Sequence, residues 1–205
     1  MSDQKYQTAA WLVFAKMAIQ LGFFVIAIIL TATGHWKVGP VIVRGFFLIL
    51  AGLISCYVLF VLRRLLWDRY DFHRLDVVIP VVAVADVVLE ILNQFTEVAQ
   101  VAYPASLATI VAVRVLFIVV PWGIINIVFA AGLLKLPFSE KSLLRPYAYL
   151  YLAAGIVLLS MILVLASPVF TFILLPCLLI TGVGSDVMLA LTFLRSKETE
   201  QVEFV

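Results

Sequence analysis

The sequence predicts an all-α fold, a bundle of six transmembrane helices that forms a single domain over residues 1–205. Two observations predict it. The chain is 65% hydrophobic and only 13% charged, with a mean hydropathy of +1.18, which lies well outside the composition of soluble domains. A bilayer core about 30 Å thick requires roughly 20 apolar residues for each helical crossing. Six such runs and their short connections use nearly the whole length, so no room is left for a separate soluble domain.

The predicted helices are six apolar runs, each bounded by turn or interfacial residues: 9–33, 41–65, 77–102, 106–134, 146–166 and 169–194. The first run is longer than the core of a signal peptide and lacks a small-residue cleavage site, so we expect it to be retained. Tight connections are expected at 34–40, 103–104 and 167–168, where glycine or proline punctuates the chain. Longer polar connections are expected at 63–76 and 135–145. The middle of the fourth run contains Pro121, Trp122, Gly123 and Asn126, and the proline is expected to free a carbonyl and bend that helix. Such breaks often line binding sites in transporters, although proline kinks are also ordinary in membrane helices.

The distribution of lysine and arginine predicts the orientation, because basic loops stay in the cytoplasm more often than they cross the bilayer. One side of the predicted bundle carries ten basic residues: Lys5, Arg63, Arg64, Arg69, Arg74, Lys135, Lys141, Arg145, Arg195 and Lys197. The other side carries only Lys37. We therefore expect an integral protein of the cell membrane, plasma or inner, with both termini in the cytoplasm.

The third run carries an ionisable stripe: Asp86, Glu90, Asn93, Glu97 and Gln100. Their successive spacings of 4, 3, 4 and 3 residues place them on one face of a helix. A charged group at membrane depth costs about 3 kcal/mol on insertion scales, so this face should meet a polar partner or water and not lipid. The stripe is the main candidate for an ion-binding or transport site.

Candidate partners for the stripe follow from depth in the membrane. Lys16 should lie near the level of Asp86 and of Asp186, whereas Arg44 and Arg114 should lie nearer the level of Glu97. These are three bases against four acids. Glu90, near the middle of the bilayer, has no base at its level, so we expect it to be protonated and able to exchange its proton. In the alternative interpretation, these groups pair off and only hold the helices in register.

The two halves of the chain share a faint pattern that suggests a 3+3 inverted-topology repeat. Lys16 and Arg114 are 98 positions apart, and Asp86 and Asp186 are 100 apart. Two tandem units of three helices have opposite orientations in a membrane, and many secondary transporters are built in this way. Glu90 has no counterpart in the sixth run, so any repeat has diverged at the proposed site.

Motifs for familiar catalytic and cofactor chemistry are missing from the sequence. We find no phosphate-binding glycine loop, HExxH zinc pattern or GxSxG elbow, which disfavours an enzyme. Both histidines, His35 and His73, are expected at the membrane edge, so a haem held between helices is disfavoured and no cofactor is predicted. A metal is neither indicated nor excluded. The small net charge of +2 and the position of the bases at helix ends argue against a nucleic-acid partner.

The leading functional hypothesis is a small transporter or channel that moves an ion or small polar solute along a path lined by the third helix, with proton coupling. Lys16, Arg44, Arg114 and Asp186 would surround that path. The first alternative is a structural or regulatory subunit of a larger membrane assembly, with an internally satisfied charge network. The second is a lipid-modifying membrane enzyme. The expected partners are membrane lipid, a small ion or solute, and either further copies of the chain or other membrane subunits.

Overall fold

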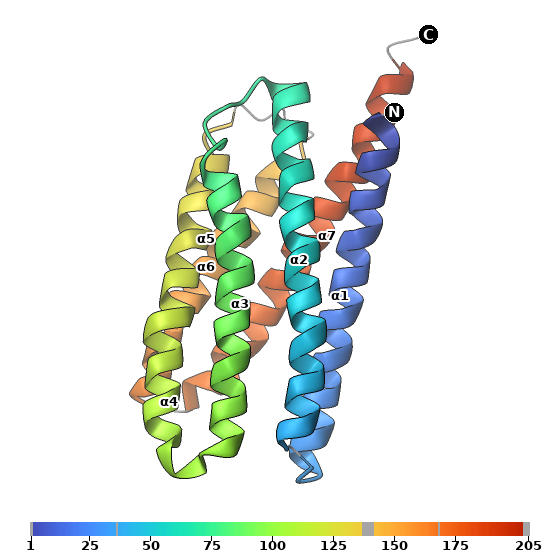
Figure 1. Ribbon diagram of the computed structural model, residues 1–205. Helices are drawn as coiled ribbons and strands as arrows, with labels where there is room; N and C mark the ends of the chain where they lie inside the picture. The colour runs from blue at the N-terminus through green and yellow to red at the C-terminus, as the bar shows by residue number, and fades with distance from the viewer. Residues whose placement is uncertain (1, 36, 137–141, 168, 203–205) are drawn as a thin grey trace.

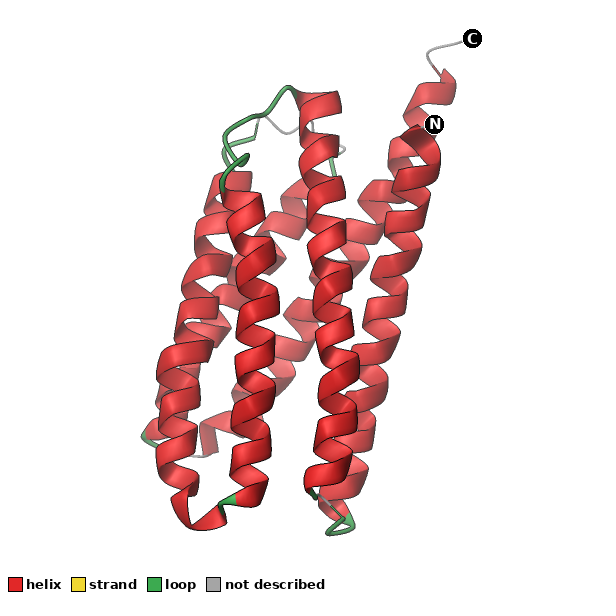
Figure 2. Ribbon diagram, in the orientation of Figure 1, coloured by secondary structure: helices red, strands yellow, loops and turns green. Residues whose placement is uncertain are grey.

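The computed structural model describes residues 2–35, 37–136, 142–167 and 169–202. Over these residues the chain is helical with no strand, and six helical stretches are long and apolar enough to cross a membrane (Figures 1 and 2). This confirms the predicted all-helical protein with six candidate membrane spans. The α-helices are α1 (Ser2–Ala32), α2 (Val38–Tyr70), α3 (Val78–Ala102), α4 (Leu107–Arg114), α5 (Val120–Leu133), α6 (Leu144–Ser160) and α7 (Val169–Val202).

The fourth span, Pro104–Leu133, is not a uniform α-helix. It begins with the 3-10 turn η1 (Pro104–Ser106), and the π-helical segment η2 (Val115–Val119) joins α4 to α5. Pro121 is the second residue after the end of η2. Its ring has no N–H to donate and would collide with the carbonyl of Phe117, four residues earlier, in a regular α-helix. The wider turns of η2 therefore lie where the sequence predicted a bend.

Three helices extend beyond the apolar runs that predicted them. α1 begins at Ser2, α2 continues to Tyr70 and α7 continues to Val202. Hydropathy marks only the part of a helix that lies in lipid, while lysine, arginine and glutamate continue a helix readily in water. The connection predicted over 63–76 is therefore half helical. α2 ends at Tyr70 and is followed by Asp71, whose left-handed conformation (φ 46°) stops the helix.

The six spans form a closed ring in chain order. α2 packs against α1 and α3, the fourth span packs against α3 and α6, and α7 packs against both α6 and α1. Both termini lie at one end of the bundle, together with the connection between α2 and α3 (Figure 1). We call this the terminal end. Because neighbouring spans are antiparallel, each can be joined to the next by a short connection.

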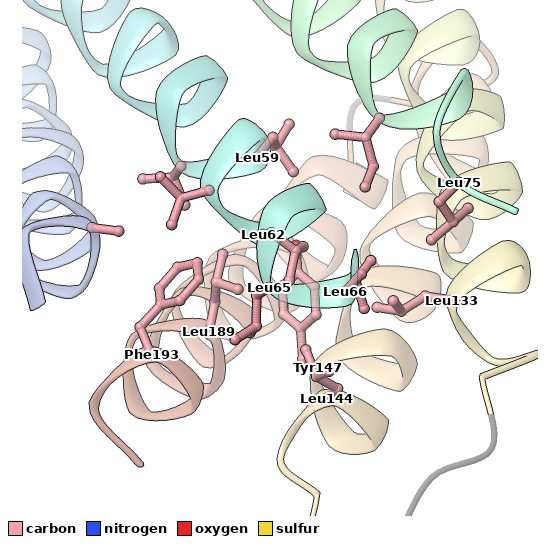
Figure 3. Packing of buried hydrophobic residues seen from close by; sticks show 14 of the residues in the cluster. Leu59, Leu62, Leu65, Leu66, Leu75, Leu133, Leu144, Tyr147, Leu189 and Phe193 are labelled. Carbon is pink, nitrogen blue, oxygen red and sulfur yellow. The ribbon is translucent and has the colours of Figure 1, made fainter. Parts of the chain in front are cut away.

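A hydrophobic core fills the terminal end of the ring. Every helix except α4 contributes to it: Ala10 and Val13 from α1, Leu62 and Leu65 from α2, Ile79 from α3, Phe129 from α5, Tyr147 from α6 and Phe193 from α7. Figure 3 shows Leu62, Leu65 and Leu66 packed near Tyr147 and Leu133. The core seals this end of the bundle with close-packed apolar side chains.

The opposite end of the bundle is more open. α7 runs diagonally behind α2, so its first half lies well away from α1 (Figure 1). Side chains in that half of α7 are strongly exposed, with Phe172 at 82% and Ile180 at 69%. Val25 and Ile29, in the corresponding part of α1, are also exposed. In a bilayer these surfaces would lie against lipid.

Candidate functional site

A cavity of about 370 Å³ lies between the helices, beside the hydrophobic core. All six spans contribute to its wall, through α1, α2, α3, α5, α6 and α7. Its charged lining comprises Lys16, Asp86, Glu90 and Asp186. Four of the nine predicted site residues therefore meet at one cavity, although they come from the first, third and sixth spans.

Lys16 and Asp186 form an ion pair at the wall of the cavity. The Nζ atom of Lys16 lies 2.8 Å from Oδ1 of Asp186, and their side chains are only 16% and 12% exposed. The contact is possible because α1 and α7, the first and last spans, are neighbours in the ring. Asp186 is one of the two acids that depth in the membrane assigned to Lys16.

Asp86 meets a neutral donor and not a base. The indole Nε1 of Trp122 donates a hydrogen bond of 2.8 Å to Oδ1 of Asp86. Asp86 is 8% exposed. Trp122 was not among the predicted site residues, although it belongs to the break at Pro121 that the sequence indicated as a candidate lining of a binding site. A partly buried tryptophan also needs an acceptor for its N–H, which Asp86 provides here.

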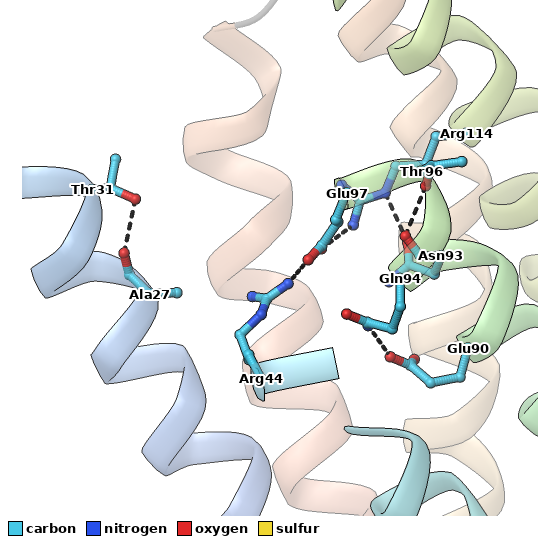
Figure 4. Close-up of polar contacts among 9 residues, drawn as sticks. All are labelled: Ala27, Thr31, Arg44, Glu90, Asn93, Gln94, Thr96, Glu97 and Arg114. Carbon is cyan, nitrogen blue, oxygen red and sulfur yellow. Dashed lines mark hydrogen bonds and ion pairs between the residues drawn. The ribbon is translucent and has the colours of Figure 1, made fainter. Parts of the chain in front are cut away.

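A second polar cluster joins α2, α3 and α4. Glu97 lies between two arginines (Figure 4) and pairs with Arg44 through one carboxylate oxygen and with Arg114 through the other. The second distance, from Arg114 Nη2 to Glu97 Oε1, is 2.8 Å. The Nε atom of Arg114 also donates to Oδ1 of Asn93 at 2.8 Å. These contacts match the levels predicted for both arginines.

Glu90 lies on α3 between Asp86 and Glu97 and lines the cavity. Its Oε1 accepts a hydrogen bond from the side-chain amide of Gln94 (Figure 4). None of the three ion pairs described above involves Glu90. Gln94 was missed by the sequence analysis, although it follows Glu90 by four residues and precedes Glu97 by three, which is the spacing of the same helical face.

Gly45 of α2 makes room for Gln94. A Cβ atom on Gly45 would lie 3.1 Å from Oε1 and 3.3 Å from Cγ of Gln94. The absent side chain thus allows Gln94, which is 6% exposed, to pack against the backbone of α2. Gln100, the last member of the predicted stripe, does not line the cavity.

Asn126 of α5 also lines the cavity. It was not among the predicted site residues, but it belongs to the segment around Pro121 that the sequence indicated as a candidate lining. It is 6% exposed, and its Oδ1 has no hydrogen-bond partner among the described residues. A buried carbonyl without a donor costs free energy, so this atom is a ready acceptor for a bound ligand or water.

A separate polar group lies outside the membrane spans, where α2 is connected to α3. The His73 ring lies 3.0 Å from Asp71 through Nε2 and 3.4 Å from Asp76 through Nδ1. The hydrogen bond to Asp71 raises the pKa of His73, and Asp76 adds to this effect. Asp76 also accepts from the indole of Trp67 and lies 3.6 Å from Arg63.

Among the described residues, no group of three or more histidine, cysteine, aspartate or glutamate side chains is placed to hold a metal ion. Comparisons with protein-family models, curated proteins and solved structures gave no match to this chain. The arrangement of its own side chains is therefore the basis for any functional argument.

Proposed function

We propose that the chain is a small transporter or channel that moves an ion or small polar solute along a path lined by α3, coupled to protons through Glu90. The observation that carries this proposal is the cavity, to which every span contributes and whose wall holds three carboxylates and one lysine. Ionisable groups at membrane depth are costly, and in membrane proteins they commonly mark ion and proton pathways. Asp86 and Glu90 would bind the cation or carry the proton.

The remaining members of the stripe would continue the path beyond the cavity. Asn93, Glu97 and Gln100 follow Glu90 on α3 in the direction away from the hydrophobic core. In this proposal Arg44 and Arg114 hold Glu97 and set the electrostatic field of that part of the path. The tight contacts of Glu97 would also keep α2, α3 and α4 in register.

We further propose that the terminal end faces the cytoplasm of the plasma or inner membrane. The ten-to-one count of basic residues supports this orientation. The hydrophobic core would then close the cytoplasmic side, and the more open half would face outward. A transporter needs a second arrangement in which that core opens and the outer half closes.

A 3+3 inverted repeat is also part of the proposal, and the matching spacing of charged residues in the two halves supports it. Exchange of the two halves would convert the Lys16–Asp186 pair into a pair between Arg114 and Asp86. Instead Arg114 pairs with Glu97, and Asp86 accepts from Trp122. Any repeat is thus not reproduced in the polar contacts.

The test is proton and cation flux into vesicles that contain the purified protein and a trapped pH-sensitive dye. The wild type should carry a flux well above that of empty vesicles, and Glu90→Gln should lose most of it because an amide cannot exchange a proton. Asp71→Asn is the matched control, since Asp71 lies outside the spans, its side chain is 96% exposed and asparagine tolerates its left-handed backbone.

Equal flux in Glu90→Gln and wild type would remove Glu90 from the mechanism. A wild type no faster than empty vesicles would contradict transport altogether.

A structural or regulatory subunit of a larger assembly is the second candidate. It is favoured by the pairing of Glu97 with two arginines and of Asp186 with Lys16, which satisfies charges inside the chain. In that case vesicles with the wild type would carry no more flux than empty vesicles. Glu90→Gln would then change assembly with partner subunits, or with further copies of the chain, and not flux.

A further inference from the structure

The cavity is lined by side chains of two kinds, which we call its polar wall and its apolar wall. One wall carries Lys16, Asp86, Glu90, Asn126 and Asp186. The other is apolar and is made by Leu21 and Phe24 of α1 with Leu175, Leu178 and Leu179 of α7. A binding site with one polar and one hydrocarbon wall is complementary to an amphipathic molecule and not to a bare ion.

The polar wall carries an excess of negative charge. It holds three carboxylates against one ammonium group, and that ammonium group is already engaged with Asp186 at 2.8 Å. Asp86 and Glu90 receive hydrogen bonds from Trp122 and Gln94, which are neutral donors. The charge that would complete this wall is therefore positive.

The polar wall also contains one acceptor that meets no hydrogen-bond donor among the described residues. Oδ1 of Asn126 is buried, lies on a residue that is 6% exposed, and has no donor among the described residues. A quaternary ammonium group could neutralise the carboxylates but has no N–H to give to this carbonyl. A protonated primary amine could do both, because it carries one charge and three N–H donors.

The apolar wall lies where α1 and α7 diverge. Leu175 is 40% exposed although it lines the cavity, and Gln20 of α1 is both exposed and part of the lining. The cavity is thus reached from the surface between these helices. In a bilayer, a hydrocarbon tail placed there would remain in apolar surroundings while its head reached Asp86.

We propose that the cavity binds an amphipathic primary ammonium ion. Its head would lie against Asp86, Glu90 and Asn126, and its hydrocarbon tail would lie between α1 and α7. The volume of about 370 Å³ is at the lower end of the ~300–1,000 Å³ typical of small-molecule sites, which suits one short chain. This names a substrate class for the transport proposed above and rests on that function only where movement of the ligand is concerned. Because the head would contact Glu90, binding of the ligand and of a proton would compete.

The test is equilibrium binding to the full chain in lipid nanodiscs, with empty nanodiscs subtracted to remove partition into lipid. Four probes separate the features of the ligand: decylammonium, decanesulfonate, methylammonium and decyltrimethylammonium. Decylammonium should bind saturably. Decanesulfonate, which reverses the charge, and methylammonium, which removes the tail, should each bind at least tenfold more weakly. The affinity for decyltrimethylammonium should be lower than that for decylammonium but higher than that for the other two probes, because it keeps the charge and the tail but donates no N–H.

Two variants locate the site in the cavity. Leu179→Trp fills its apolar side and should weaken decylammonium binding at least tenfold. Ile180→Trp is the matched control, because Ile180 is adjacent, 69% exposed and not part of the lining, so binding should be unchanged. Asn126→Leu should also weaken decylammonium and should abolish its advantage over decyltrimethylammonium. Equal binding of decanesulfonate, or equal binding in Leu179→Trp and Ile180→Trp, would overturn the proposal.

The outcomes distinguish this site from the transport proposal. If decylammonium binds as expected but vesicles carry no flux, the site stands and transport is wrong. The opposite result is a Glu90-dependent flux in vesicles together with a decylammonium ion that does not bind, is not transported and does not inhibit that flux. In that case transport stands and the ammonium site is wrong. The comparison of probes on the wild type retains its force even where a variant fails to fold.

Discussion

Gly123 of α5 and Gly155 of α6 face each other across a contact that has no room for side chains. A Cβ atom on either glycine would lie 2.9 Å from the carbonyl oxygen of the other. Small residues at such crossings let helix backbones approach closely, which drives packing in membranes where the hydrophobic effect between helices is weak. The pair therefore fixes α5 against α6, and with it the position of Trp122 and Asn126 on the cavity wall.

Gly155→Ala should destabilise the protein by about 1–3 kcal/mol, because the added methyl group meets backbone atoms that cannot move aside easily. Thermal unfolding of the purified protein in one detergent measures the change. Gly22→Ala on α1 is the control, since a Cβ there meets no atom within 4 Å. An equal effect of both substitutions would show that the α5–α6 contact is not tight.

Lys16→Met should destabilise the protein by roughly 3–5 kcal/mol, because it leaves Asp186 without its base in a site where both side chains are nearly buried. The double variant Lys16→Met/Asp186→Leu should be more stable than Lys16→Met alone, since it removes the unpaired charge. Unfolding of the two single variants and the double variant completes a double-mutant cycle. Additive losses would mean that the two groups do not interact.

Glu97→Gln should reduce stability more than Asn93→Ala, because it removes the carboxylate shared by Arg44 and Arg114 and leaves two guanidinium groups close together. Arg114→Lys should also be destabilising, as one ammonium group cannot reach both Glu97 and Asn93 with the planar geometry of arginine. The measurement is again thermal unfolding, with reconstituted flux as a second readout. Full stability of Arg114→Lys would show that charge alone matters here.

His73 should make the stability of the α2–α3 connection depend on pH. The hydrogen bond to Asp71 raises its pKa in the folded protein above the unfolded value of about 6.5. The stabilising effect is therefore fully present below that value and is lost as the pH rises through the higher folded pKa. Compared with His73→Gln, the wild type should gain stability at pH 5.5 and lose this advantage above neutral pH. Titration of the imidazole by NMR would give the folded pKa directly, and a value below 6.5 would contradict the assignment.

Several features of this protein follow from the sequence alone. Backbone groups in lipid must be satisfied within the chain, and an apolar run of about 20 residues matches the bilayer, so the helical class and the number of spans could be predicted from composition. The spacing of Asp86, Glu90, Asn93 and Glu97 also placed them on one face of α3, because residues three or four positions apart lie on the same side of a helix. The ends of α1, α2 and α7 could not be predicted, since hydropathy stops at the membrane while the helix continues into water.

Only the tertiary structure decided which side chains meet. Helical spacing gives the direction of a face but not the neighbour that lies there, which depends on the order of spans in the ring and on how closely the backbones approach. Lys16 reaches Asp186 because the first and last spans pack together. Asp86 meets Trp122 through a contact that no periodic pattern encodes, and Gln94 can pack beside Glu90 because α2 presents Gly45 at that point. The cavity exists because apolar side chains fill the terminal end of the ring, whereas α1 and α7 diverge toward the other end. This depends on side-chain volumes in three dimensions.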